Sequence, residues 1–171
     1  HYILFVGSPK ERRHWLDWSL FHVEQNYLDV WKNYHRALRH RNTLLKEARL
    51  INSSEIEGWE KQIAEEGGKI DDMREKYLFS LCSALNEKHL PFVLPGKANI
   101  NYLNKDYAKN GLRKTLETNR NSEASKGYTF FGPHRTDILF DYQGTRVEKH
   151  LSRGQTKLFA ASLISAQLAK L

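Results

Sequence analysis

The sequence predicts a mostly helical α+β fold, in which a long antiparallel helix hairpin is inserted into a head that carries a small antiparallel sheet. Three observations support this prediction. Two long stretches place apolar residues at three- and four-residue steps, as helices do. Short runs bounded by turn residues follow, as strands require. A final apolar helix comes after these runs.

The first elements are short. Residues 2–6 form an apolar run that predicts a strand, and Gly-Ser-Pro at 7–9 predicts a turn. Proline is favoured at the first position of a helix, so Pro9 should begin one. Residues 11–22 continue with closely spaced tryptophan, leucine and phenylalanine side chains, which predict a short buried helix.

The hairpin is expected over residues of about 24–49 and 54–89. The apolar stripe of its first helix is interrupted only at Arg41 or Asn42. Ser54 to Glu57 has the spacing of a capping box and should open the second helix. Gly67-Gly68 is the weak point of that helix, because each glycine costs about 1 kcal/mol relative to alanine in a helix interior.

The head is expected from the remaining elements. Residues 105–123 read as a polar helix, and Gln143-Gly144 is a plausible hairpin turn. A last helix should begin near residues 151–155. The expected strands are 92–94, 99–103, 127–131, 136–142 and 146–148.

Composition limits the function classes. The net charge of +7 favours an anionic partner. The single cysteine, Cys82, excludes an intramolecular disulfide framework, so a reducing cytoplasm is expected and a buried, unreactive thiol is favoured. No apolar run reaches membrane-spanning length, and no signal peptide pattern is present. The start at His1 and the final helix without a cap signal predict a piece of a longer protein.

Basic residues are concentrated in the first hairpin helix, and acidic residues in the second. In one interpretation the two helices flank a seam with complementary charges. In the other, the basic helix is a DNA-binding stripe that includes Arg36, Arg39 and Arg41. Arg12 and Arg13 leave a similar choice between phosphate contacts and ion pairs with acids of the head. The histidine and cysteine spacing does not predict a metal site.

Residues 151–155 read Leu-Ser-Arg-Gly-Gln. Ser152 can cap the following helix, and Gly154 removes the side chain that would block a phosphate from its first amides. A simple capped helix is the alternative. The string resembles the signature motif of ATP-binding-cassette ATPases, although Arg153 stands where the transporters have glycine. This resemblance implies that Ser152, Arg153, Gly154 and Gln155 contact nucleotide held by a second subunit.

Several strings together resemble the RecF family. They are Arg-Arg-His-Trp-Leu-Asp-Trp at 12–18, Tyr-His-Arg-Ala-Leu at 34–38, Arg-Asn-Thr-Leu-Leu at 41–45, Gly-Pro-His-Arg-Thr-Asp at 132–137 and the signature string. The resemblance implies an ATPase head related to chromosome-maintenance and Rad50-like proteins, formed by residues 1–9 and 92–171, with residues 10–91 as a helical arm. It also raises His134 and Arg135 as contacts to nucleotide or DNA.

The same resemblance implies a DNA-repair and recombination ATPase of the cytoplasm, associated with the nucleoid and not with a membrane. It implies ATP and Mg²⁺ as cofactors, an ATP-dependent homodimer, gapped DNA with single- and double-stranded parts as substrate, and RecO and RecR as partners. The phosphate-binding Gly-x-x-x-x-Gly-Lys-Ser/Thr loop is absent from this sequence. Asp137 to Asp141 imitates a Walker B strand but precedes the signature, and is interpreted as an ordinary strand. The chain alone should therefore bind no cofactor and hydrolyse no ATP.

Two other functions remain open. One is a non-enzymatic helical interaction module in which the signature string only caps a helix. The other is the arm and head piece of a different chromosome-maintenance-type ATPase. Only the double-arginine and Gly-Pro-His-Arg strings favour the RecF family over the second alternative.

Overall fold

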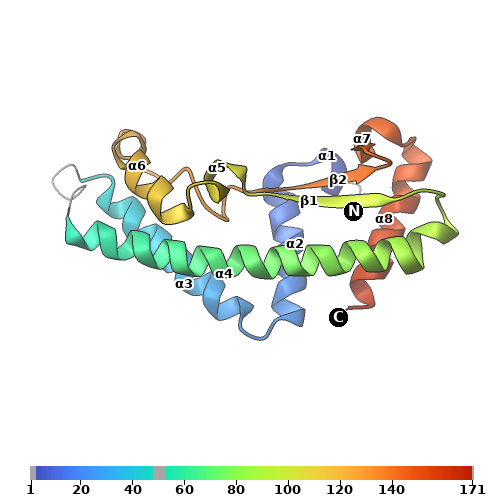
Figure 1. The fold of residues 1–171 in the computed structure, drawn as a ribbon, viewed down its shortest axis with the longest axis horizontal. Coiled ribbons are helices and arrows are strands. Elements are labelled where there is room, and N and C mark those ends of the chain that lie inside the picture. The colour runs from blue at the N-terminus through green and yellow to red at the C-terminus, as the bar shows by residue number, and fades with distance from the viewer. Residues whose placement is uncertain (1–2, 48–52, 171) are drawn as a thin grey trace. The chain divides into compact units, whose positions relative to one another are not determined.

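A computed structural model describes residues 3–47 and 53–170, without the side chains of residues 105 and 106. The chain divides into two compact units. The first contains residues 1–25, 73–103 and 136–171, and the second contains residues 26–72 and 104–135. Helix α4 (Ser54–Ala84) contributes to both units (Figure 1). The expected head and arm, divided at residues 10 and 92, do not coincide with these two units. The division into head and arm therefore stays a prediction.

The first unit begins with two helices, α1 (Ile3–Val6) and α2 (Pro9–Val23). The strand expected over residues 2–6 is wrong in its described part, since the Gly7 amide donates to the Ile3 carbonyl at 2.7 Å and closes a helical turn. A short apolar run fits either structure equally well by pattern alone. Pro9 does begin α2, and the Glu11 carboxylate accepts from the Ser8 amide at 2.6 Å.

A three-stranded antiparallel sheet lies in the first unit, in the order β1 (Ala98–Leu103), β2 (Asp137–Tyr142) and β3 (Thr145–Arg146). Gln143 and Gly144 connect β2 to β3 with φ angles of 49° and 79°. Positive φ at both positions is what a type I′ hairpin turn requires, so the expected turn is confirmed.

Of the other strands expected in this unit, the one over residues 92–94 is wrong and the one over residues 146–148 is shorter than expected. Phe92 is the last residue of a 3₁₀ helix, η3 (Leu90–Phe92), and the Val93 and Leu94 amides that follow both donate back to the Leu90 carbonyl. The strand expected over 146–148 ends at Arg146, where helix α7 (Val147–His150) begins.

The long helix α4 continues into a π-helical turn, η2 (Leu85–His89), which ends where the second hairpin helix was expected to end. The last helix is α8 (Arg153–Leu168). Phe5 of α1 packs edge-on against Phe140 of β2 and Phe159 of α8, with ring centroids 5.3 and 5.5 Å apart. These contacts place the core of the first unit between its helices and the sheet.

The second unit is built on the expected hairpin of α3 (Tyr27–Leu44) and the first part of α4. α3 ends at Leu44, earlier than the expected end at residue 49, which itself lies outside the described residues. Ser53 rather than Ser54 accepts from the Ile56 amide, so the second helix begins as expected but is capped one residue earlier. α4 continues through Gly67, where an added Cβ would lie 3.3 Å from the Tyr34 ring and 3.4 Å from Pro133. Gly67 therefore permits close packing.

The helix expected over 105–123 forms as two pieces, α5 (Lys105–Ala108) and α6 (Leu112–Ala124). The strand expected over 127–131 is wrong. Its backbone amides bond to side chains rather than to a neighbouring strand: Thr129 donates to Asn42 Oδ1 at 2.9 Å, and Phe130 donates to Glu123 Oε1 at 2.6 Å. In the described part of the chain, no helix has the length and apolar character needed to cross a membrane.

Candidate functional site

The start of α8 is an open helix N-terminus. Ser152 accepts from the Gln155 amide at 3.3 Å, and its own amide donates to Gln155 Oε1 at 2.9 Å, which completes a capping box. Residues 152–155 are all exposed. At Gly154, an added Cβ would meet no described atom within 4 Å, apart from its chain neighbours and the backbone of its own helix.

This geometry leaves donors available. Gln155 and Thr156 amides are bonded to Ser152, whereas the amides of Arg153 and Gly154 have no acceptor among the described residues. The Ser152 oxygen accepts within the cap, so its hydroxyl proton is free to donate outward. Two amides, one hydroxyl and the positive end of the helix dipole form an arrangement that suits an anion.

Arg12 is an internal clamp and does not reach outward. Its guanidinium holds both carboxylate oxygens of Asp137 at 2.7 and 2.9 Å, and it donates to the Gly7 carbonyl at 2.7 Å. Arg13 donates to the Thr136 carbonyl at 2.7 Å. Of the two interpretations for Arg12, the ion pair with an acid is the one observed. Asp137, at the start of the strand that imitates Walker B, is engaged in this pair.

A second buried arginine, Arg74, also bonds to the residue next to the start of β2. Arg74 of α4 is 2% exposed and holds Asp17 Oδ1 through Nε at 3.0 Å and Nη2 at 2.7 Å. Its Nη1 donates to Tyr102 at 3.1 Å and to Thr136 Oγ1 at 3.2 Å. The double-arginine string, through Arg12, Arg13 and Asp17, therefore fixes the start of β2 to α2 and α4.

His134 is held on both ring nitrogens within the second unit. Nε2 lies 3.1 Å from the Thr129 carbonyl, which can only accept, so Nε2 carries the proton. Nδ1 then accepts from the Tyr34 hydroxyl at 2.6 Å. The neighbouring Arg135 is exposed, and its guanidinium carbon lies 5.4 Å from the centre of the Tyr128 ring. His134 thus positions the turn, whereas Arg135 stays available.

The three arginines expected as a DNA stripe separate into two groups. Arg36 and Arg39 are exposed on α3. Arg41 is fully buried, so its place among DNA contacts is wrong. It lies 2.9 Å from Glu60 and 2.6 Å from Glu123. It faces inward because it falls on the apolar stripe of α3, in phase with the buried Leu38 and Leu45.

The charges of this buried network compensate one another. Arg120 also holds Glu60, through Nη2 at 2.6 Å, and this hydrogen bond raises the pKa of Arg120. Burial raises the pKa of Glu123 above its usual value, although Arg41 and the Phe130 amide act against the rise. Both acids are almost fully buried. Between α3 and α4, the expected complementary charges meet at the Arg41–Glu60 pair, which α6 extends into a buried ion network.

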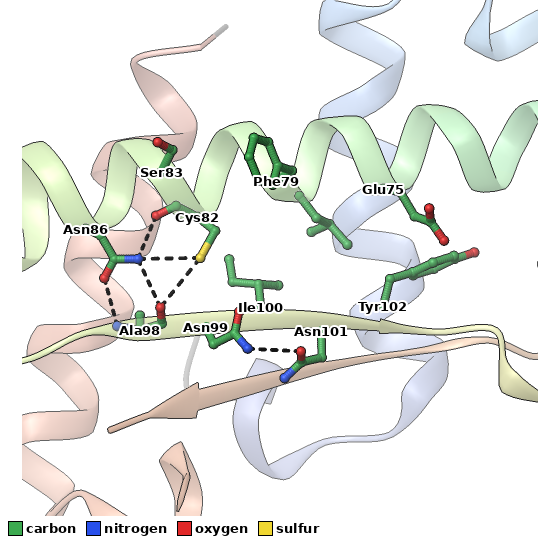
Figure 2. A pocket seen from close by; sticks show the side chains of 11 residues that line it. Glu75, Phe79, Cys82, Ser83, Asn86, Ala98, Asn99, Ile100, Asn101 and Tyr102 are labelled. Atoms are coloured by element: carbon green, nitrogen blue, oxygen red, sulfur yellow. Dashed lines mark hydrogen bonds between the residues drawn. The ribbon is translucent and has the colours of Figure 1, made fainter. Parts of the chain in front are cut away.

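A groove of about 490 Å³ lies between α4 and β1 in the first unit, and Figure 2 shows its lining. Asn86 closes one end, since its side-chain nitrogen donates to the Ala98 carbonyl and its oxygen accepts from the Ala98 amide. The Cys82 thiol lies 3.6 Å from the same carbonyl, and it is half-buried rather than buried as expected. Its partial burial raises the pKa of the thiol, which disfavours the thiolate.

Sequence reasoning missed the residues that complete these sites. The Glu60 and Glu123 partners of Arg41 lie far from it in sequence. Tyr128, which lies against Arg135, was assigned to a strand. The interruption of the apolar stripe at Arg41 was the one available signal for the buried network.

The chain resembles curated bacterial proteins over nearly its whole length. It is 34% identical over 172 residues to the DNA replication and repair protein RecF of Nitrosococcus oceani, covering 97% of this chain and 46% of that protein. It is 32% identical over 164 residues to the protein of the same name from Vibrio cholerae, covering 96% and 45%. The chain thus spans about half the length of these relatives. No protein-family model matches it.

Solved structures agree in fold. One is described as the recombination mediator protein RecF-ATPrS in the RecFOR pathway, with a TM-score of 0.86 and 26% identity, covering 98% of this chain and 48% of the other. A second, described as RecF-ATP in the same pathway, has a TM-score of 0.83 at 26% identity, covering 98% and 47%.

The fold, mostly helical with a small three-stranded antiparallel sheet, is of the ATP-binding-cassette ATPase type. With its sequence matched over 97% by RecF proteins, the chain belongs to the RecF family. The resemblance read from the sequence motifs is confirmed.

Proposed function

We propose that the full-length protein containing this chain is an ATP-dependent recombination mediator that acts on gapped DNA during repair. Two observations support the proposal. The relatives are named DNA replication and repair proteins, and the solved neighbours are described as recombination mediators with ATP or an ATP analogue. The observation that carries the mechanism is the exposed start of α8, where Ser152 to Gln155 leave donors free.

In this proposal α8 completes an ATP site on a second subunit. The amides of Arg153 and Gly154 and the Ser152 hydroxyl take oxygens of the terminal phosphate, while the Arg153 side chain adds positive charge nearby. The side-chain nitrogen of Gln155 remains a further donor, because only its oxygen is used in the cap. The partner subunit's phosphate loop and Mg²⁺-binding acids would lie in parts of the protein outside this chain. ATP then favours a dimer, because only the dimer surrounds it.

The wider role follows from the same assignment. DNA with a single-stranded gap is the proposed substrate, RecO and RecR are the proposed partners, and the nucleoid of the cytoplasm is the proposed location. The net charge of +7 supports an anionic substrate. Binding that depends on lysine and arginine contacts to phosphates should weaken steeply as salt is raised.

The test uses two substitutions in the full-length protein that preserve the helix cap. Aspartate and asparagine are both good N-caps, so Ser152→Asp and Ser152→Asn should both keep α8 stable. Ser152→Asp places a negative charge against the phosphate and removes the hydroxyl donor. We expect it to abolish ATP-driven dimerisation in analytical ultracentrifugation, with ATP binding to the monomer unchanged.

Ser152→Asn is the matched control, because it keeps the cap and adds no charge, and it should retain at least part of the dimer. Equal dimerisation by Ser152→Asp and the unaltered protein in saturating ATP would refute the proposed role of α8. Loss of ATP binding by the Ser152→Asp monomer would refute it as well, since the nucleotide would then be bound in cis.

A further inference from the structure

An exposed aromatic residue of the second unit carries an arginine over its ring. Tyr128 is 44% exposed, although tyrosine is a large side chain that packing would normally cover, and Arg135 lies 5.4 Å from its ring centre. Phe130 packs edge-on against the same ring at 4.9 Å. Arg135 has no carboxylate or hydrogen-bond partner for its side chain among the described residues.

Two lysines lie next to Gly127, the residue directly before Tyr128. An added Cβ at Gly127 would lie 3.3 Å from Cγ of Lys46, so the Lys46 side chain passes over the backbone next to Tyr128. Lys126 is exposed on the other side of Gly127. Neither lysine has a carboxylate partner in the part of the chain that the structure describes. Lys46, Lys126, Tyr128 and Arg135 are called the Tyr128 patch below.

The backbone that carries the patch is held by hydrogen bonds to side chains of α3 and α6. Asn42 Oδ1 accepts from both the amide and the hydroxyl of Thr129, directly after Tyr128. Glu123 accepts from the Phe130 amide, and the Arg135 amide donates to the Gly132 carbonyl at 2.8 Å. A ligand would therefore meet a ring and cations whose backbone is already ordered, which lowers the entropy cost of binding.

We propose that the Tyr128 patch binds single-stranded nucleic acid, with an unpaired base stacked on the Tyr128 ring and the adjacent phosphates held by Arg135, Lys46 and Lys126. Cations alone would accept any polyanion, including duplex or an acidic peptide. The exposed ring adds a preference for a flat π-surface, which an unpaired base offers and a base inside a duplex does not. This proposal deepens the proposed function and rests on its DNA-binding part.

The test is fluorescence anisotropy with the full-length protein at fixed salt and three probes: an oligothymidylate, an abasic oligonucleotide with the same number of phosphates, and a duplex. Tyr128→Ala should weaken oligothymidylate binding about tenfold, the scale of one lost base–aromatic contact. It should change abasic and duplex binding less than about twofold. Tyr128→Phe, which keeps the ring, should bind like the unaltered protein.

Arg135→Ala should weaken oligothymidylate and abasic binding together and reduce the salt slope for single strands by about 0.7, the value for one lost phosphate contact. Lys114→Ala and Phe92→Ala are controls for charge and for an exposed ring, since both side chains are exposed at other places. Both should leave all three affinities unchanged. Because Tyr128 is partly exposed, its variants should fold, which circular dichroism verifies.

Unchanged oligothymidylate binding by Tyr128→Ala would overturn the patch while leaving the DNA role of the protein intact. An equal loss for the oligothymidylate, abasic and duplex probes would also overturn it, since stacking would then not be involved. If the unaltered protein bound none of the probes at low salt, both the patch and the DNA-binding part of the proposed function would fall.

Discussion

Replacing Arg41 by methionine tests the buried ion network of the second unit. Methionine keeps the apolar stem of the side chain and removes its charge. Glu60 retains Arg120, which holds both its carboxylate oxygens at 3.0 and 2.6 Å. Glu123 is 0% exposed and would lose its cation while keeping only the Phe130 amide. The substitution therefore leaves one carboxylate buried without a cation.

Removing one partner of a buried ion pair costs about 3–5 kcal/mol. We expect Arg41→Met to lower the free energy of unfolding by about that amount at pH 7.5, measured by urea denaturation followed by circular dichroism. Arg36→Met and Arg39→Met are matched controls on the same helix, because both side chains are exposed. Each should change stability by less than about 0.5 kcal/mol.

The loss should depend on pH in a defined direction. Burial raises the pKa of Glu123 in the folded protein, and Arg41 opposes that rise, so Arg41→Met raises the pKa further. A raised folded pKa means that the folded state binds more protons than the unfolded state between the two pKa values. The stability that Glu123 gains from this proton uptake is complete below its pKa in the unfolded state. It is lost as the pH rises through its pKa in the folded state.

Arg41→Met should therefore be less destabilising at pH 5 than at pH 7.5, because Glu123 takes up a proton at the lower pH. The double variant Arg41→Met/Glu123→Gln should recover part of the loss at pH 7.5, since it has no unpaired charge to bury. A loss at pH 7.5 under about 1 kcal/mol, or an equal loss at both pH values, would contradict the reasoning.

Two further predictions concern α4 and the ATPase reaction. Gly68→Ala should raise the free energy of unfolding by about 0.5–1 kcal/mol, because nothing among the described residues lies within 4 Å of the added Cβ and alanine favours helix. Gly67→Ala should gain less or lose stability, because its Cβ would lie 2.8 Å from Leu112; an equal gain in urea denaturation would disprove the packing role of Gly67. The 171-residue chain alone should hydrolyse no ATP, since its sequence has no phosphate-binding loop. Phosphate release above background, absent from a Ser152→Asp variant, would refute this.

The sequence was most informative where a pattern extends over many residues. Both hairpin helices were predicted, because an apolar stripe repeated over several turns fits only one period. The second was predicted nearly to its ends, whereas the first ends at Leu44 rather than near residue 49. The turn at Gln143 and Gly144 was predictable because few residue pairs tolerate positive φ at both positions. The capped start of α8 was predictable for a similar reason, since Ser152 and Gln155 satisfy one another within four residues.

Shorter and non-local features were beyond this reasoning. Residues 3–6 and 127–131 are runs of four and five residues, too short for periodicity to separate a helix, strand or loop. In the second run, the Thr129 and Phe130 amides donate to Asn42 and Glu123 from distant helices, where a strand would bond to a neighbouring strand. The same holds for Arg41, whose place on the apolar stripe indicates burial, although nothing local identifies which acids compensate it.

The strings that identified the family serve different purposes in the structure. Arg12 and Asp17, from one string, hold Asp137 and Arg74, and His134 bonds within its own unit, so these residues stabilise the fold rather than present charge. A ligand needs groups that the fold has not already used. By that criterion the candidates reduce to the start of α8 in the first unit and the Tyr128 patch in the second, which keep free donors or an exposed ring. Family motifs therefore locate the fold reliably, whereas unused hydrogen-bonding capacity locates the surfaces where function should be tested.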